Sequence, residues 1–334
     1  MQPKRTRVLI VDDSLVAINI LMKILQTASD IEVIGTAHDG KEAMKLIGNL
    51  RPAVVCTDFH MPGMNGLELV ENIMQHHPCP VLVVSVSATP GSSNVFRLLE
   101  AGALDIVTKP RLEHATAYGG IANELLSKIR ILAGVKVFKR KKLLAAAAAA
   151  SAKPAPPPPT AFGQSHYQMV VIGASTGGPQ ALLTILSNLP FNYPVPIVCV
   201  QHISDGFLNN LVSWLANNST LKCQLALAGE LPQAGTVYFP QERAHLKFDP
   251  CGKFVISADP PYKGHCPSVS VTMQSAAECF GANMVSVLLT GMGDDGADGM
   301  RAVSMAGGIT IAQDEVSCVV FGMPKQAIVM GAAK

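Results

Sequence analysis

The chain has 334 residues, of which 49% are hydrophobic and 15% charged, and this is enough apolar material for two globular domains. Its 26 basic and 24 acidic residues give a net charge of +2, which argues against a surface built to bind polyanions such as nucleic acids. No run reaches the ~18 apolar residues that span a membrane. The eight cysteines form no CxxC pair and no Cys/His cluster at zinc spacing, so we expect a cytoplasmic protein with reduced cysteines.

In the first half of the chain, short apolar runs rich in β-branched residues alternate with stretches of helical periodicity. Five strands that alternate with helices predict a parallel, doubly wound sheet. The expected strands are Arg7–Val11, Ile31–Ala37, Ala53–Thr57, Val81–Ser85 and Asp105–Thr108.

A linker is predicted near the middle of the chain, where residues 141–160 read KKLLAAAAAASAKPAPPPPT. Proline lacks an N–H group and clashes with the preceding helical turn, so the Pro-rich end should be extended. We therefore expect a first domain over residues 1–133, a Pro/Ala-rich linker over 134–166 and a second domain over 167–334.

The second domain is predicted to contain another doubly wound parallel sheet. The runs Met169–Ile172, Pro196–Gln201 and Met284–Leu289 are apolar throughout, as central parallel strands buried on both faces should be. Between them, Leu221–Phe254 is rich in Gly and Pro and predicts shorter strands and turns.

Polar side chains lie at four strand ends of the first domain. Asp12 and Asp13 follow the first strand, Asp58 the third and Lys109 the fifth, and Ser85 ends the fourth. Ligands of open α/β sheets bind at this edge, and converging carboxylates favour a hard cation such as Mg²⁺. A carboxylate beside that cation can accept a phosphoryl group. Helix capping by the first two aspartates is the simpler alternative, but it leaves the other strand ends unexplained.

Residues 7–110 resemble the flavodoxin-like receiver domain of bacterial response regulators, through VDDS (11–14), TDFHMPGMNG (57–66), VS (84–85) and TKP (108–110). The resemblance implies that Asp58 is phosphorylated by a histidine kinase and that Asp12, Asp13 and Asp58 hold Mg²⁺. It also implies that Ser85 and Lys109 sense the phosphoryl group, with a cis bond between Lys109 and Pro110.

A candidate nucleophile lies in GASTGG (173–178), which follows the strand MVVI and fits G-x-S-x-G around Ser175. Glycines allow a tight turn, and the helix that follows offers backbone N–H groups to a developing anion. Such a turn could also cradle a phosphate, but the sequence matches neither the P-loop nor the dinucleotide-binding pattern.

A serine nucleophile needs a base and a group that orients the base. His202 follows the strand PIVCVQ, and Asp294 and Asp295 follow MVSVLL, so all of them should lie at one sheet edge with Ser175. From the residues alone, either aspartate could orient the base. His245 and His265 are rival bases, although neither clearly follows a buried parallel strand.

Residues 168–334 look like the Rossmann-like catalytic domain of the protein-glutamate methylesterases of bacterial chemotaxis. The segments that carry the resemblance are IGASTGGP (172–179), VQH (200–202), VYF-P (237–240), PSV (267–269), LLTGMG-DGA (288–297), TIAQDE (310–315) and VVFGMP (319–324). The order of receiver, linker and hydrolase is also that of the family.

The resemblance implies that Ser175 is the nucleophile, His202 the general base, Asp295 the orienting carboxylate and the Met292 N–H an oxyanion donor. It further implies hydrolysis of glutamate methyl esters on chemotaxis receptors, with deamidation of glutamines as a second activity and no metal needed for hydrolysis. The receiver would inhibit the hydrolase until Asp58 is phosphorylated. The protein would contact membrane receptor arrays peripherally.

Three features depart from the family pattern. Cys266 replaces the usual arginine and Ser270 the usual aspartate, changes that could alter the substrate groove without touching the three catalytic residues. The chain also ends at Lys334, before the expected C-terminal segment. An alternative function is a response regulator whose second domain only binds a partner, which requires an unreactive Ser175. A DNA-binding output is disfavoured, because no helix-turn-helix pair lies on a basic face.

Overall fold

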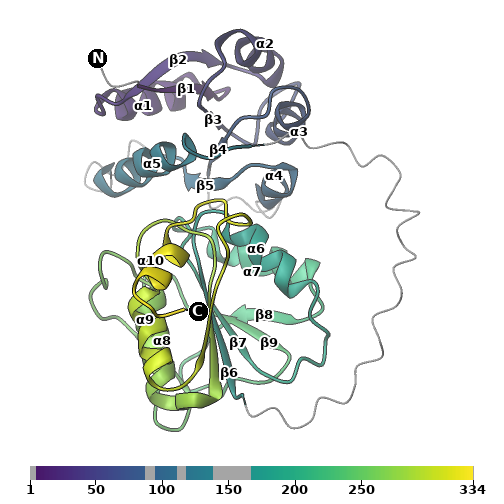
Figure 1. The fold of residues 1–334 in the computed structure, drawn as a ribbon. Coiled ribbons are helices and arrows are strands. Elements are labelled where there is room, and N and C mark those ends of the chain that lie inside the picture. Colours follow the sequence, from purple (N-terminus) through teal and green to yellow (C-terminus); the bar gives the residue numbers. More distant parts are fainter. Residues whose placement is uncertain (1–4, 87–94, 111–117, 138–166, 334) are drawn as a thin grey trace.

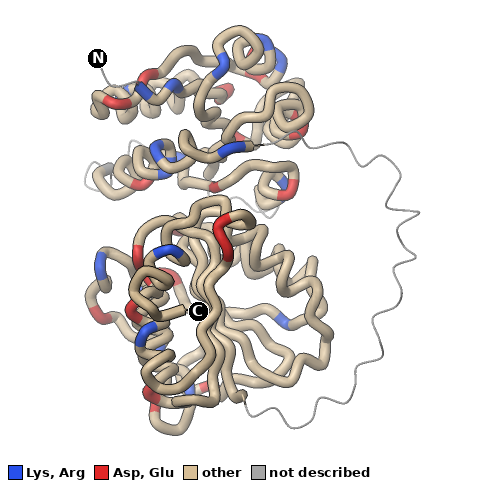
Figure 2. The backbone as a smooth tube through the Cα atoms, viewed as in Figure 1, with Lys and Arg blue, Asp and Glu red and all other residues tan. Residues whose placement is uncertain are grey.

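The computed structural model describes residues 5–86, 95–110, 118–137 and 167–333, and the expected linker lies largely outside them. The described residues form two α/β domains, coloured purple to blue and teal to yellow in Figure 1. None of their helices is long and apolar enough to cross a membrane. In the view of Figure 2, acidic and basic residues are interspersed over both domains.

Five parallel strands form the sheet of the first domain, in the order β2-β1-β3-β4-β5. Their bounds are β1 (Thr6–Val11), β2 (Ile31–Ala37), β3 (Val54–Thr57), β4 (Val81–Ser85) and β5 (Asp105–Thr108). The predicted strands are therefore confirmed to within one residue at each end.

Helices cover both faces of this sheet. The alternation of side chains along β1 sends Val8 and Ile10 to one face and Leu9 and Val11 to the other. The first face packs against α1 (Leu15–Gln26) and α5 (Tyr118–Leu132). The second packs against α2 (Gly40–Leu50), α3 (Gly66–His76) and α4 (Phe96–Ala101).

The second domain has a six-stranded parallel sheet, in the order β13-β12-β6-β7-β9-β8. The strands are β6 (Met169–Ala174), β7 (Ile197–Gln201), β8 (Lys222–Leu225), β9 (Thr236–Phe239), β12 (Met284–Leu288) and β13 (Ile309–Ala312). Both predicted doubly wound folds are thus confirmed. The Gly/Pro-rich stretch forms short strands, as expected.

One face of the second sheet packs on α6 (Gly178–Leu186) and α7 (Leu208–Asn218). The other packs on α8 (Val269–Phe280), α9 (Ala297–Met305) and α10 (Met323–Val329). An antiparallel hairpin of β10 (His245–Phe248) and β11 (Phe254–Ser257) lies against α8, and a short 3₁₀ helix (Gly281–Asn283) precedes β12.

The two domains meet through the edge of the first sheet, where α4 and β5 lie beside α6 and α7 (Figure 1). Trp214 of α7 stacks on Phe96 of α4 with ring centroids 5.4 Å apart, and its Nε1 donates to Glu100 at 2.8 Å. Gln180 of α6 donates to the carbonyl oxygen of Ala103 at 2.9 Å. Aromatic packing and direct hydrogen bonds therefore hold this edge beside the loops that follow β6 and β7.

Candidate active site

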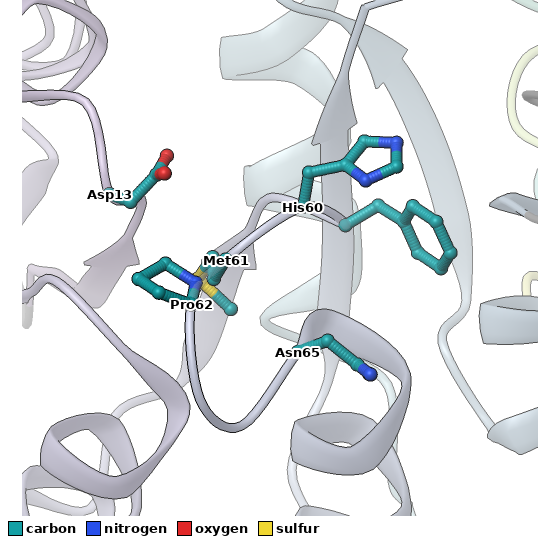
Figure 3. A pocket seen from close by; sticks show the side chains of 6 residues that line it. Asp13, His60, Met61, Pro62 and Asn65 are labelled. Carbon is teal, nitrogen blue, oxygen red and sulfur yellow. The ribbon is translucent and has the colours of Figure 1, made fainter.

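Three carboxylates gather at the carboxyl ends of β1 and β3. Asp12 and Asp58 are buried and Asp13 is exposed, and each offers one oxygen within 4.8 Å of the others. Nζ of Lys109 lies 2.6 Å from Oδ2 of both buried aspartates. Asp13 faces the loop after β3 across a pocket (Figure 3). The residues that line this pocket are Asp13, Phe59, His60, Met61, Pro62 and Asn65.

The electrostatics of this cluster fit a divalent cation. Burial raises the pKa of Asp12, although the neighbouring Lys109 opposes the shift. Burial also disfavours the charged form of Lys109, but Asp58 and Asp12 outweigh it and raise the pKa of the ammonium. One ammonium against three carboxylates leaves excess negative charge, and carboxylate oxygens are ligands that Mg²⁺ prefers. The residues present therefore fit the expected Mg²⁺ site.

The two expected phosphoryl sensors lie at adjacent strand ends. Ser85 pairs with Thr108 across β4 and β5, and the Lys109 N–H donates to the Ser85 carbonyl at 2.8 Å. The expected cis bond between Lys109 and Pro110 is wrong, because among the described residues only the Cys266–Pro267 bond is cis. The trans isomer is the lower in energy for most X–Pro bonds.

The turn that carries Ser175 links β6 to α6 and depends on its glycines. Gly177 has φ of 79°, a left-handed conformation that glycine adopts without strain. A Cβ on Gly178 would lie 2.1 Å from Oε1 of Gln201, so only glycine allows α6 to approach β7 this closely. The half-buried Ser175 consequently lies at the carboxyl end of β6, just before a helix N-terminus.

His202 lies directly beside this turn. Ala174 is opposite Gln201 in the parallel pairing of β6 with β7, so Ser175 and His202 occupy the next positions on adjacent strands. The His202 N–H donates to the Ala174 carbonyl at 2.9 Å. The Gln201 side-chain amide donates to the carbonyl oxygens of Ser175 and His202, both at 2.8 Å, and so ties the two loops together.

The His202 ring contacts Asp295 and not Asp294. Nε2 of His202 is 2.9 Å from Oδ2 of Asp295, which is fully buried. Asp294 is exposed and pairs with Lys263 at 3.1 Å. Burial opposes ionisation of Asp295, but His202 and hydrogen bonds from Ser270 and its neighbours outweigh it and lower the pKa of this carboxyl below its ordinary value.

The Asp295 carboxylate also occupies the N-terminus of α8. It accepts hydrogen bonds from the Val269 N–H at 2.8 Å, the Ser270 N–H at 3.0 Å and the Ser268 hydroxyl at 2.8 Å. Unpaired N–H groups and the helix dipole both stabilise an anion at such an end. Sequence reasoning missed this contact. Ser268 is recognisable as an N-cap, but nothing in the sequence indicates that a remote carboxylate binds at the same helix end.

Ser270 has a role that the sequence did not predict. Its side chain is fully buried, and its hydroxyl accepts from the Gly296 N–H at 2.7 Å. It therefore supports the loop that carries Asp295, and its effect on a substrate groove stays a prediction. Cys266 is half-buried, so its effect on a groove stays a prediction.

A second Ser-His pair lies next to Asp295 but has no reachable hydroxyl. Nδ1 of His245 accepts from the Ser268 N–H at 3.2 Å, and its Nε2 donates to the Pro260 carbonyl at 3.2 Å. Both side chains are buried, and the Ser268 hydroxyl donates to Asp295. With both ring nitrogens engaged, His245 is disfavoured as a base.

Backbone from the loop after β12 surrounds Ser175. The Ser175 N–H donates to the Thr290 carbonyl at 3.0 Å, and a Cβ on Gly291 would lie 2.7 Å from that of Ser175. Met292 follows with a side chain that is 48% exposed. Within the described part of the chain, neither the Ser175 hydroxyl nor the Met292 N–H is engaged in a hydrogen bond.

His265 lies against His202, with ring planes 2° from parallel and centroids 4.3 Å apart. Ligand atoms of the two rings and Asp295 lie within 4.8 Å of one another, which raises the possibility of a metal site. However, the in-plane lone pairs of parallel rings do not converge on one point, and the carboxylate already accepts several hydrogen bonds. The geometry therefore favours a stacked pair over a metal centre.

A receiver with an acidic pocket, joined to an α/β domain with a serine, a histidine and a buried aspartate at one sheet edge, defines a response regulator with a hydrolase output. The chain belongs to the family of CheB-type protein-glutamate methylesterases/protein-glutamine glutaminases. A family model described as CheB methylesterase matches residues 170–334, and one described as response regulator receiver domain matches residues 8–116.

Two curated relatives carry the description protein-glutamate methylesterase/protein-glutamine glutaminase. The protein from Nitrosospira multiformis is 40% identical over 327 residues, covering 98% of this chain and 92% of its own length. The protein from Koribacter versatilis is 40% identical over 335 residues, covering 99% and 92%. The solved Thermotoga maritima CheB methylesterase catalytic domain is 41% identical, with a TM-score of 0.49, and the match covers 50% of this chain and 90% of that one.

The contact between Gly291 and Ser175 generates the first prediction. Gly291→Ala introduces a Cβ that would lie 2.3 Å from Sδ of Met323 and 2.7 Å from Cβ of Ser175. The methionine can move, but the serine turn cannot move without changing the site, so methanol release should fall about 10²-fold. The matched control is Gly120→Ala, which lies in α5 with open space around the new Cβ. Unchanged hydrolysis in Gly291→Ala would contradict the close approach.

Proposed function

We propose that Ser175 attacks the side-chain ester carbonyl of a methylated glutamate while His202 accepts the hydroxyl proton. The tetrahedral intermediate collapses when His202 returns this proton to the departing methanol, which leaves an acyl-enzyme. Water, deprotonated by the same ring, then attacks the acyl group to give glutamate and free serine. A glutamine side chain follows the same route and releases ammonia, which accounts for deamidation.

The observation that carries this proposal is the contact between His202 and the buried Asp295, one strand away from Ser175. The carboxylate holds Nε2, so the other ring nitrogen, Nδ1, is left to accept the serine proton. The Met292 N–H and the N-terminal end of α6 are available to the developing oxyanion. No metal takes part in these steps.

The proposed substrates are methylated glutamates and certain glutamines on the helices of chemotaxis receptors, consistent with the printed descriptions of the relatives. The enzyme would act in the cytoplasm and meet membrane receptor arrays only peripherally.

The first domain is proposed to accept a phosphoryl group on Asp58 from a histidine kinase. Asp12, Asp13 and Asp58 would hold Mg²⁺, which neutralises charge on the transferred group. Lys109 already contacts the acceptor carboxylate, and with Ser85 it would detect the added phosphoryl oxygens.

We further propose that the unphosphorylated receiver restrains the hydrolase. Thr176, the residue after the nucleophile, donates to Asp105 of β5 at 2.6 Å. Thr108, the neighbour of Lys109, donates to the carbonyl of Asp205 in the loop after His202 at 3.0 Å. The first and last residues of β5 therefore contact the two loops proposed to be catalytic, and a phosphoryl-induced shift of Lys109 would reach the nearer contact, at Thr108, directly.

Ser175→Ala tests the nucleophile. It should lower methanol release from methylated receptor membranes by about 10⁴-fold or more, because alanine lacks the hydroxyl that forms the acyl-enzyme. Labelling by a serine-directed fluorophosphonate should disappear, while phosphorylation of the receiver persists. Turnover near the parent rate would rule out this assignment.

Asp58→Asn tests the control site. The amide cannot accept a phosphoryl group, so a small-molecule phosphodonor should no longer raise methanol release, whereas basal release should stay at the parent level. A full response of this variant to the phosphodonor would show that activation does not pass through Asp58.

Gln180→Ala tests the restraint. It removes a hydrogen bond from α6 to the Ala103 carbonyl. Basal methanol release should therefore rise about two- to tenfold, because the net stabilisation by one ordinary hydrogen bond corresponds to a change of this size. Release with phosphodonor should not change. The control is Asn188→Ala, whose amide bonds only within its own helical region. Equal basal rates in the two variants would argue that this contact does not restrain the enzyme.

A further inference from the structure

Within the described ranges of the chain, one side-chain hydrogen bond holds His202, from Nε2 to Oδ2 of Asp295. One such bond fixes the position of one ring nitrogen but leaves the ring plane free to tilt about it. Proton transfer from Ser175 needs the second nitrogen at a defined place and angle, and small misplacements reduce rates strongly. A second contact that sets the ring plane would meet this need.

The face of the His202 ring is covered by His265. The two rings are parallel within 2° and their centroids are 4.3 Å apart. Burial and His202 lower the pKa of His265, although Asp295 and Asp294 oppose the shift, so the ring stays uncharged at neutral pH. An uncharged His265 ring can stack on His202 whether His202 is neutral or protonated. It does not repel the imidazolium that forms on His202 during the reaction.

His265 is held rigidly by a tight hairpin, residues 262–265. The N–H groups of Tyr262 and His265 each donate to the carbonyl of the other at 3.0 Å. Lys263 and Gly264 have φ values of 49° and 85°, as a two-residue type I′ turn requires. The left-handed conformation is costly for lysine, so tertiary contacts must hold it.

Those contacts reach the catalytic loop. Lys263 Nζ is 2.6 Å from Oδ2 of Asp298 and 3.1 Å from Oδ2 of Asp294, and the Tyr262 hydroxyl donates to Asp298 at 3.0 Å. Hydrogen bonds to Asp298 and Asp294 accordingly raise the pKa of Lys263. Asp294 directly precedes Asp295, and Asp298 lies in the first turn of α9. One short segment, residues 294–298, therefore carries both the carboxylate that holds His202 and the acids that hold the hairpin.

We propose that His265 is a positioning residue, whose ring fixes the plane of the His202 imidazole and keeps it aligned with Asp295. The ion pairs of Lys263 with Asp298 and Asp294 hold the hairpin in place. This inference deepens the proposed function and rests on it, since it assumes that His202 is the base.

The test compares His265→Ala, which removes the ring, with His265→Phe, which keeps a stacking ring but no ring nitrogen. Both are assayed with phosphodonor present for kcat and KM of methanol release, and for the rate of fluorophosphonate labelling. His265→Ala should lower kcat and the labelling rate about 10- to 100-fold with little change in KM. His265→Phe should restore most of both rates.

Lys263→Met removes the ion pairs that hold the hairpin and should lower kcat. The loss should be only about two- to fivefold, because exposed ion pairs are weak. Its control is Arg130→Met, which removes an exposed ion pair with Asp30 in the first domain and should not change kcat. Receiver phosphorylation and thermal unfolding show whether each variant folds. If His265→Ala does not fold, His265→Phe and Lys263→Met still test the positioning role of His265.

Unchanged kcat and labelling in all three variants would overturn the positioning role. Equal losses in His265→Phe and His265→Ala would also overturn it, because a ring nitrogen and not the stacked ring would then be required. If the parent protein itself releases no methanol and is not labelled, the proposed function fails, and this outcome is distinct from both of the others.

Discussion

The catalytic edge depends on one buried charge, the carboxylate of Asp295. Burial of an unpaired carboxylate is strongly unfavourable, so its oxygens must find donors. They find them in the His202 ring, the Ser268 hydroxyl and the first N–H groups of α8. Because these donors belong to two segments remote from the loop that carries Asp295, satisfying the charge also fixes where the three segments lie. The orientation of the His202 ring is thus a consequence of solvating this carboxylate inside the protein.

The edge of the first domain lies between its acidic pocket and this site, and the path between them is short. Lys109 contacts the acidic pocket, and the preceding Thr108 contacts the loop that follows His202. A residue three positions earlier, Asp105, contacts the residue that follows Ser175. Lys109 directly follows β5, so a change in its position, as proposed, would have only this strand to cross before it reached both loops. The short distance favours a rigid-body response of the domain edge over a long chain of side-chain rearrangements.

The sequence predicted the features that depend on local pattern and failed where remote segments meet. Parallel core strands were found because they are continuous apolar runs, and polar residues at their ends were found because the sheet brings those ends together. The choice of Asp295 over Asp294 was open from the residues alone, because the two aspartates differ in burial and the sequence does not show which of them is buried. The cap on α8, the His265 stack and the Thr176 contact were missed, since each joins segments that no periodicity relates. The bond from the Gly296 N–H to the Ser270 hydroxyl was also missed, because a serine carries no signal of its burial.

The domain interface combines apolar packing with polar bonds. Outside the stacked Phe96 and Trp214 rings, the bonds run largely from side chains such as Gln180 to backbone carbonyls or carboxylates. Water can replace such donors and acceptors when the surfaces separate, so the net cost of breaking each bond is small. The apolar part of the contact resists separation, because one buried cluster holds Phe96 and Leu99 of the first domain together with Trp214 of the second, and opening would expose it. Under the proposed restraint, the free energy from phosphorylation of one aspartate must therefore be spent mainly on exposing this apolar contact and only slightly on breaking the polar bonds.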